Sequence, residues 1–242
     1  MSLLGAIGYV SGGTRPDIAN AFRALANYTK APTRQAWKQL QNLIVFLRTT
    51  RSCGLTFGIR LPFTFIPTNP KFSKFGANLS NYITVFADTD WAKDHDRVSV
   101  SEYISYFQGC PISWCSKKQK GTVALSSMEA ERVSACLGAT EAAWLRKLWG
   151  IFDPTALDIP VNLCVDNQAI IYFANMDVAH TKAKHIDLKY YYIKAHVNDG
   201  TIIMWHVPSK INPADIFTKP LRADHHLELM QMLGLRRFEE VC

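Results

Sequence analysis

Four acidic residues stand where the predicted strands and helices begin or end. They are Asp88 and Asp166, at the ends of predicted strands, and Glu129 and Asp215, near the starts of predicted helices. In a mixed sheet, the ends of central strands and the starts of flanking helices can converge on one edge. Carboxylates gathered there repel one another and favour a hard divalent cation.

Such a set of acids suits phosphodiester hydrolysis. Two cations about 4 Å apart can activate a water and stabilise the leaving oxygen of a phosphodiester. The net charge of +7 and a predicted basic turn at Lys117, Lys118 and Lys120 favour a phosphate substrate. Acid–base catalysis by two carboxylates, as in glycosidases, is the competing use. Taken singly, each acid is also an ordinary turn residue or a helix N-terminal charge.

The strands that would position the acids are rich in β-branched, aromatic and other apolar residues. We predict them at residues 82–87, 98–107, 112–116, 161–165 and 201–207. Short connections favour antiparallel pairing of the first three. The nearly all-apolar segment 161–165 is typical of a central strand covered on both faces. The sequence therefore predicts an α/β fold.

A long helix is predicted from about residue 127 to residue 151. Ser126 and Ser127 are its N-cap candidates, and Glu129 suits the dipole of its first turn. Apolar residues recur at helical spacing and predict one buried stripe: Ala130, Val133, Leu137, Trp144, Leu148 and Ile151.

The N-terminal part looks different from the rest. Residues 1–50 are predicted to be helical, with a helix opening at Thr14-Arg-Pro-Asp17. Prolines and glycines interrupt residues 51–81, so we place a domain boundary near residue 80. This gives a helical appendage at 1–80 and an α/β domain at 81–242.

Composition excludes several classes. The 242 residues contain no apolar run of about 18 residues, so no membrane span is predicted. The N-terminus lacks the long apolar region of a signal peptide. Six cysteines without a CxxC pair or a zinc spacing predict free thiols in a reducing compartment.

Seven stretches carry a family resemblance. They are Thr14-Arg-Pro-Asp-Ile-Ala19, Phe86-Ala-Asp-Thr-Asp-Trp-Ala92, Pro111-Ile-Ser-Trp-Cys-Ser-Lys-Lys-Gln119, Val123-Ala-Leu-Ser-Ser-Met-Glu-Ala-Glu131, Cys164-Val-Asp-Asn-Gln168, Lys184-His-Ile-Asp187 and Pro213-Ala-Asp-Ile-Phe-Thr-Lys-Pro-Leu221. In this order and spacing, the chain resembles the Ty1/copia-type retrotransposon polyprotein. The resemblance covers the end of its reverse transcriptase and its ribonuclease H domain.

The resemblance implies a ribonuclease H-like fold, in which helices flank a five-stranded mixed sheet whose first three strands are antiparallel. It implies cleavage of the RNA strand of RNA–DNA hybrids during reverse transcription, with two Mg²⁺ ions that Mn²⁺ can replace. The metal-binding acids of the family match Asp88, Glu129, Asp166 and Asp215, and Asp88 would bridge both ions.

The resemblance also suggests contacts and partners. Candidates for the hybrid's minor groove and its 2′-hydroxyls are Ser126, Ser127, Asn167 and Gln168, and Lys117 and Lys118 would take phosphates. Residues 1–50 resemble the last helices of reverse transcriptase but carry no polymerase motif. We therefore expect a partner in the reverse transcriptase portion of the same polyprotein, and self-association through residues 1–50. A cytoplasmic virus-like particle is the expected location, with the nucleus as the alternative.

Some choices stay open at the sequence level. Asp90 and Glu131 each lie two residues beyond a chosen acid, and positions 129 and 131 of a helix point about 200° apart. The first acid of each pair matches the family better, so we expect Glu131 to point elsewhere. His180 and His185 are further candidates to assist catalysis.

Departures from the family pattern leave the activity open. Glu102 stands where the family usually has glycine, and Arg132 replaces an aromatic residue. The alternatives are therefore a catalytically inactive nucleic-acid-binding module and another nuclease of the same fold.

Overall fold

The computed structural model describes residues 2–58, 82–91, 98–119, 126–176, 188–218 and 221–238. Its strands are β1 (Cys53–Leu55), β2 (Thr84–Asp90), β3 (Val100–Phe107), β4 (Cys110–Lys118), β5 (Val161–Val165), β6 (Ile202–His206) and β7 (Leu235–Arg237). Its α-helices are α1 (Leu3–Gly13), α2 (Ala19–Ala26), α3 (Arg34–Thr49), α4 (Ser127–Phe152), α5 (Gln168–Asn175), α6 (Leu188–Asn198) and α7 (Ala223–Met232). Short 3-10 helices are η1 (Pro16–Ile18), η4 (Pro154–Asp158), η5 (Ser209–Ile211) and η6 (Pro213–Phe217).

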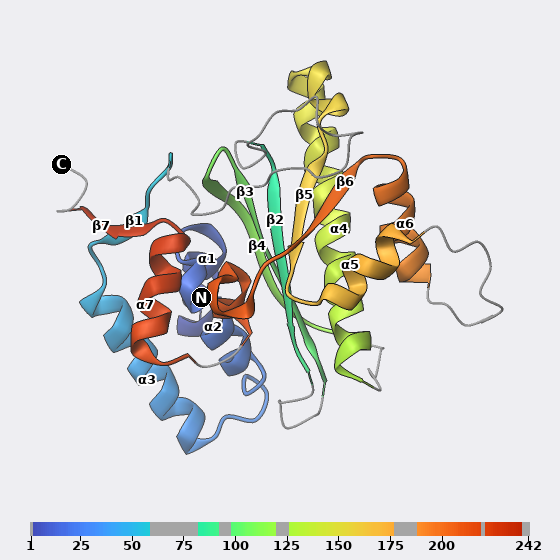
Figure 1. Cartoon of the computed structure of the whole chain (residues 1–242). Coiled ribbons are helices and arrows are strands. Elements are labelled where there is room, and N and C mark those ends of the chain that lie inside the picture. The colour runs from blue at the N-terminus through green and yellow to red at the C-terminus, as the bar shows by residue number, and fades with distance from the viewer. Residues whose placement is uncertain are drawn as a thin grey trace.

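Five strands form one mixed sheet in the order β4-β3-β2-β5-β6. Strands β2, β3 and β4 pair antiparallel, whereas β5 runs parallel to both β2 and β6. Figure 1 shows α4, α5 and α6 on one face of this sheet and α1, α2 and α7 on the other. The five-stranded mixed sheet with antiparallel first strands that the resemblance implies is therefore confirmed.

Strand β2 is buried along most of its length because both faces of the sheet are covered. Phe86 packs in one core cluster with Phe217 and Leu229, under η6 and α7. Val85 and Ala87 belong to a second cluster beneath α4. Since side chains alternate along a strand, Asp88 and Asp90 continue the face of Phe86.

Helix α4 lies close to the sheet because small residues form its inner face. Ala135, Ala139 and Ala142 are fully buried. A methyl group added at Gly138 would stand 3.1 Å from the Cβ of Ala87, so the backbones approach closely here. The helix begins after Ser126, as predicted.

The buried stripe predicted for α4 is wrong in its C-terminal half. Trp144, Leu148 and Ile151 are exposed. The short side chains of alanine and glycine allow a closer contact with the sheet than these large residues would. The helix is therefore rotated about its axis from the phase that the large apolar residues predict.

The N-terminal helices are held by a buried ion pair. The Arg15 guanidinium donates two hydrogen bonds to Asp17, at 2.9 and 2.7 Å, and both side chains are almost fully buried. Arg15 also donates to the hydroxyl of Thr50 at 2.8 Å, which joins η1 to the end of α3. Pro16 occupies the first position of η1, as the Thr14-Arg-Pro-Asp17 pattern predicts.

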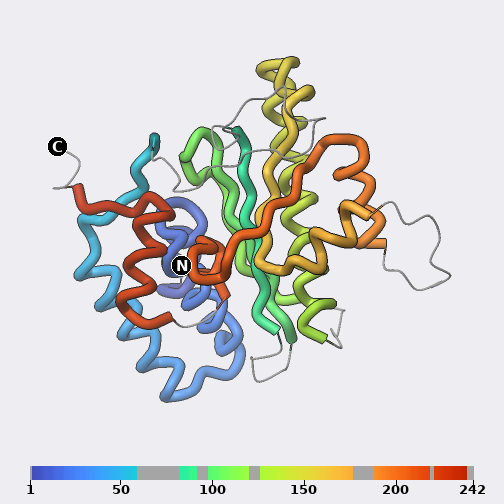
Figure 2. The backbone as a smooth tube through the Cα atoms, viewed as in Figure 1, coloured from blue at the N-terminus to red at the C-terminus, as the bar shows by residue number. Residues whose placement is uncertain are grey.

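These N-terminal elements pack against the sheet. The Trp114 indole on β4 donates to the carbonyl of Ser11 on α1 at 2.9 Å. Ala19, Phe46 and Leu55 join the core cluster that contains Phe86. Strand β1 pairs antiparallel with β7 near the C-terminus (Figure 2). The predicted boundary near residue 80 lies outside the described residues.

Other boundaries differ from the sequence prediction. Strand β4 continues to Lys118, so Lys117 and Lys118 lie in a strand and not in a turn. Asp215 lies in a short 3-10 helix. Strand β7 was not predicted.

Lys120, His180 and His185 fall outside the described residues. Within the described part of the chain, no helix is long and apolar enough to span a membrane.

Candidate active site

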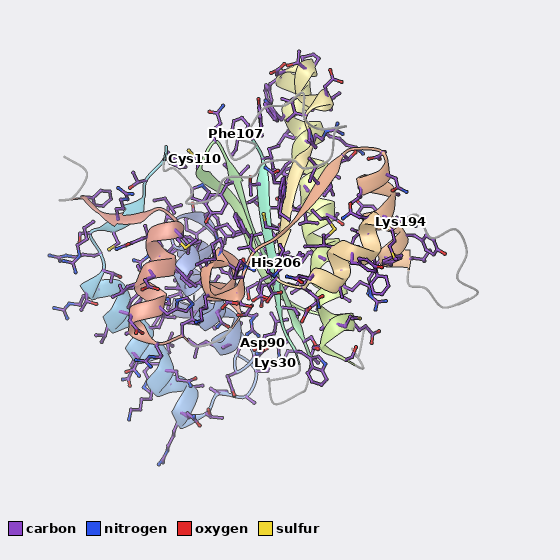
Figure 3. All side chains as sticks on the ribbon, in the orientation of Figure 1. Lys30, Asp90, Phe107, Cys110, Lys194 and His206 are labelled. Carbon is purple, nitrogen blue, oxygen red and sulfur yellow. The ribbon has the colours of Figure 1, made fainter. Side chains whose placement is uncertain are left out.

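The register of the sheet brings two of the predicted acids together. Strand β2 pairs with β5 up to Phe86 and Cys164, and Asp166 follows directly after β5. Continuing this register by two residues sets Asp166 level with Asp88 on neighbouring strands, which lie about 4.8 Å apart. Figure 3 shows Asp90 near the same end of the sheet.

Asp215 joins this pair from the segment that covers the face of Phe86. It lies in η6 and is only 3% exposed. Its carboxyl group shares a hydrogen bond with that of Asp88. The structure thus gathers Asp88, Asp166 and Asp215, from three separated segments, at one end of the sheet.

The pKa of Asp88 is raised well above its ordinary value. Burial is the main cause, since the side chain is 8% exposed. The hydrogen bond with Asp215 and the negative charges of Asp215 and Asp166 raise it further, while a backbone hydrogen bond at Thr89 opposes the shift. A cation placed among these groups would reduce the cost of ionising Asp88.

On α4, the structure places Glu131 beside two of the strand acids. Glu131 lines a small pocket together with Asp88 and Asp166, and Glu129 is not among the residues that line it. The pKa of Glu131 is raised, mainly by burial and also by the charge of Asp166. A hydrogen bond from Asn167 opposes this shift. The expectation that Glu131 points elsewhere is therefore wrong, and the rotation of α4 explains why.

The predicted hybrid-contacting residues have different surroundings. Ser126 caps α4, since its hydroxyl accepts from the backbone of Glu129 at 3.2 Å. Asn167 caps α5 with its side-chain oxygen and donates to Glu131 through its nitrogen. Both side chains thus already serve the local fold. Ser127 and Gln168 are exposed at the first positions of α4 and α5.

Lys117 and Lys118 stand at the end of the edge strand β4, between two grooves. One groove, of about 540 Å³, runs along α1 and α2 and also contains Arg23. The other, of about 470 Å³, runs along the outer face of α4 and contains Lys189. Basic side chains therefore border both grooves at the end of β4.

Three uncharged side chains donate hydrogen bonds to the strand ends that carry the acids. Ser134 of α4 donates to the carbonyl of Asp88. Asn212 donates to the carbonyl of Ala87 at 3.2 Å, and Ser209 donates to the Asp166 carboxylate at 2.7 Å. We did not predict these residues. The only sequence signal was the Asn212-Pro213 pair, which is typical of a turn or a cap.

Glu102, which departs from the family pattern, is fully buried opposite Asp88 on β3. Its pKa is raised, first by burial and then by the charge of Asp88, while the charge of Arg23 lowers it. Ser116 lies within hydrogen-bond distance of one of its oxygens, at 3.5 Å. A neutral Glu102 is consistent with this buried position.

The chemistry of the donors fits a divalent cation, although the acids do not form a ready ligand group. Among the described residues, no three His, Cys, Asp or Glu side chains are grouped so that they could hold a metal ion. The hydrogen bond between Asp88 and Asp215 requires a proton on one of the two carboxyl groups. A hard cation bound by oxygen ligands can take the place of that proton.

We expect Asp88→Asn to raise the melting temperature of the metal-free protein at pH 8. The pKa of Asp88 is raised in the folded state, so ionising this group costs stability as the pH rises above its unfolded-state pKa. The amide removes that cost, so the gain should shrink toward about pH 4, where the wild-type group is protonated. Each kcal/mol gained corresponds to about 2–4 °C in a protein of this size.

Calorimetry in EDTA at several pH values measures this gain. Asp224→Asn, at an exposed carboxylate on α7, is the matched control and should change little. A loss of stability in Asp88→Asn, or a gain independent of pH, would contradict the view that burial and repulsion make an ionised Asp88 destabilising.

The chain was compared with known proteins. No protein-family model matches it. It is 32% identical over 241 residues to the retrovirus-related Pol polyprotein from transposon RE2 of Arabidopsis thaliana, covering 99% of this chain and 15% of that protein. It is 31% identical over 235 residues to the corresponding polyprotein from transposon TNT 1-94 of Nicotiana tabacum, covering 97% of this chain and 16% of that protein.

Among solved structures, LC11-RNase H1, isolated from compost by a metagenomic approach, aligns with 57% of this chain and 92% of its own, at 18% identity and a TM-score of 0.42. The chain spans only 15% and 16% of the length of these two polyproteins. Along nearly its whole length, the chain belongs with the retrovirus-related Pol polyproteins of copia-type transposons, of which it matches one segment.

Proposed function

We propose that the chain is a metal-dependent ribonuclease H that cleaves the RNA strand of RNA–DNA hybrids during reverse transcription of a retrotransposon. The observation that supports this most is the convergence of Asp88, Asp166 and Asp215 at one end of the sheet, where burial and like charges raise the pKa of Asp88. The relationship to Pol polyproteins of transposons supports the same substrate.

The acids would bind two Mg²⁺ ions, or Mn²⁺ in their place. We propose Asp88, Asp166 and Asp215 as ligands and, because of its place in the pocket, Glu131 instead of Glu129. When bound, the ions would supply a water of lowered pKa and stabilise the leaving oxygen. The chain's own part is to hold the carboxylates in place: Ser209 orients Asp166 through its hydroxyl.

The lysines of β4 are suited to hold the other strand of the hybrid. Lys117 pairs with Ser101, which pairs with Thr89, and so it lies two strands from β2. At 4.8 Å per strand, the separation is about 10 Å. Phosphates of the DNA strand can reach this line while the RNA strand lies at the acids. Contacts to RNA 2′-hydroxyls would then come from the exposed Ser127 and Gln168.

The N-terminal helices suggest the protein partner. Residues 2–58 pack on the sheet through the Trp114 contact and the shared core. In the relatives, the matching segment is part of a much longer Pol polyprotein. We propose that the reverse transcriptase portion of such a polyprotein is the partner. Self-association is the alternative, since Tyr9 and Trp37 on these helices remain more than half exposed.

Incubation of the full chain with a labelled RNA–DNA hybrid tests the proposed activity. We expect cleavage of the RNA strand with Mg²⁺, none with EDTA, and none from Asp166→Asn. Equal cutting by wild type and Asp166→Asn would point to a contaminating nuclease. Binding of the hybrid without cutting would support the inactive module, which the absence of a ready ligand group among the described acids favours.

A matched pair of variants on α4 identifies the fourth acid. We expect Glu131→Gln to reduce cleavage by about a hundredfold or more, as when a group that acts in the transition state is removed. Glu129→Gln, which changes the same residue type two positions earlier, should keep most of the wild-type rate. The reverse order of rates would restore Glu129 as the ligand.

The proposed binding of phosphates by lysines predicts a change in salt dependence. In the double variant Lys117→Gln with Lys118→Gln, the slope of log affinity for the hybrid against log salt should fall by about one for each phosphate that is no longer neutralised. Lys147→Gln, at an exposed position near the far end of α4, is the control for net charge. An equal decrease of the slope in the control would show that only the overall charge matters.

A further inference from the structure

Strand β2 continues past the point where its pairing with β5 ends. The last paired residues are Phe86 and Cys164, whereas β2 continues to Asp90. The next carbonyl, that of Ala87, accepts a hydrogen bond from the side-chain nitrogen of Asn212 at 3.2 Å. Beyond the end of the β5 pairing, the Asn212 side chain thus supplies a hydrogen bond to β2 at the residue immediately before Asp88.

The other groups of Asn212 are bonded to the segment that carries Asp215. Its side-chain oxygen accepts from the backbone of Ala214 at 3.1 Å and caps η6. Its backbone carbonyl accepts from the backbone of Asp215, also at 3.1 Å. Asn212 is fully buried, so these bonds form without competition from bulk water.

We propose that Asn212 is a positioning residue that fixes Asp215 relative to Asp88. This inference rests on the proposed nuclease function. The two carboxylates would repel each other whenever both ionise, and the loop before η6 could move away to relieve that repulsion. The amide opposes this movement because it ties the start of η6 to β2, one residue before Asp88.

Only an amide meets both demands at this position. Its nitrogen donates to β2 while its oxygen caps η6, and it brings no charge to the acids. A serine at this position can still cap the helix, because short hydroxyl side chains are good N-caps. The shorter serine side chain does not extend to the carbonyl of Ala87. Asn212→Ser therefore separates the tie to β2 from the cap.

The chain offers a matched control for the cap itself. Asp153 caps η4 in the same manner, with its oxygen accepting from the backbone of Thr155 at 3.0 Å. Like η6, η4 has five residues and begins with proline. Asp153 lies after the C-terminus of α4, at the opposite end of that helix from Glu131. Asp153→Ser thus alters an equivalent cap away from the acids.

The experiment uses the full-length wild type, Asn212→Ser and Asp153→Ser. Binding of Mn²⁺ is measured from the electron paramagnetic resonance signal of the free ion, without nucleic acid. Single-turnover cleavage of the hybrid and the melting temperature in EDTA are measured in parallel. We expect Asn212→Ser to bind Mn²⁺ about tenfold or more weakly and to cut correspondingly more slowly, the usual effect of removing a residue that orients metal ligands.

A purely structural role would move the melting temperature but not the metal affinity. If Asn212→Ser and Asp153→Ser bind Mn²⁺ and cut alike, the positioning role is overturned. If Asn212→Ser does not fold, Asn212→Thr is measured instead, and failure of both to fold also overturns the proposal. If the wild type neither binds Mn²⁺ nor cuts, the nuclease function itself fails, which is distinct from failure of a variant alone.

Discussion

The parallel pairing of β2 with β5 is the constraint on which the site depends. Its register sets Asp166 level with Asp88 on adjacent strands, and η6, which packs on the same face as Phe86, adds Asp215. Burial leaves little water to screen these charges, so like charges so close together resist ionisation. The elements around this end of the sheet must therefore hold the acids together against their own repulsion. The raised pKa of Asp88 reflects its burial first and this repulsion second.

Uncharged donors hold these strand ends without neutralising them. Ser134, Asn212 and Ser209 come from α4, from the loop before η6 and from η5, and each donates a hydrogen bond at the end of β2 or to Asp166. A lysine or arginine in their place would pair with a carboxylate and compete with a cation. A hydroxyl or amide restricts the geometry and leaves the negative charge available. The choice of neutral donors is thus consistent with a site that binds cations.

The acids of the central strands could be predicted because strand alternation is a local property of the sequence, although β2 continues two residues beyond Asp88. The position of Glu131 beside these acids could not be predicted, because it depends on which face of the helix meets the sheet. Large apolar residues such as Trp144 indicated one face, but the short side chains of Ala135 and Ala139 allow closer packing. Glu131 lies one turn before Ala135 and therefore on the helix face that meets the sheet. Glu129, two residues earlier, points in a different direction. The misplaced stripe and the unexpected position of Glu131 thus have one cause.

The residues that hold the acids depend on contacts between distant parts of the chain. The pair Asn212-Pro213 indicates a cap, and the cap forms, but the second bond of Asn212 reaches a strand 125 residues earlier. The indole of Trp114 likewise reaches Ser11, 103 residues away. Local rules describe what a side chain does for its own backbone, whereas a role across the sheet appears only once the topology is known. A capping residue beside a group of like charges therefore has to be judged by its second hydrogen bond, since the first one only explains the turn.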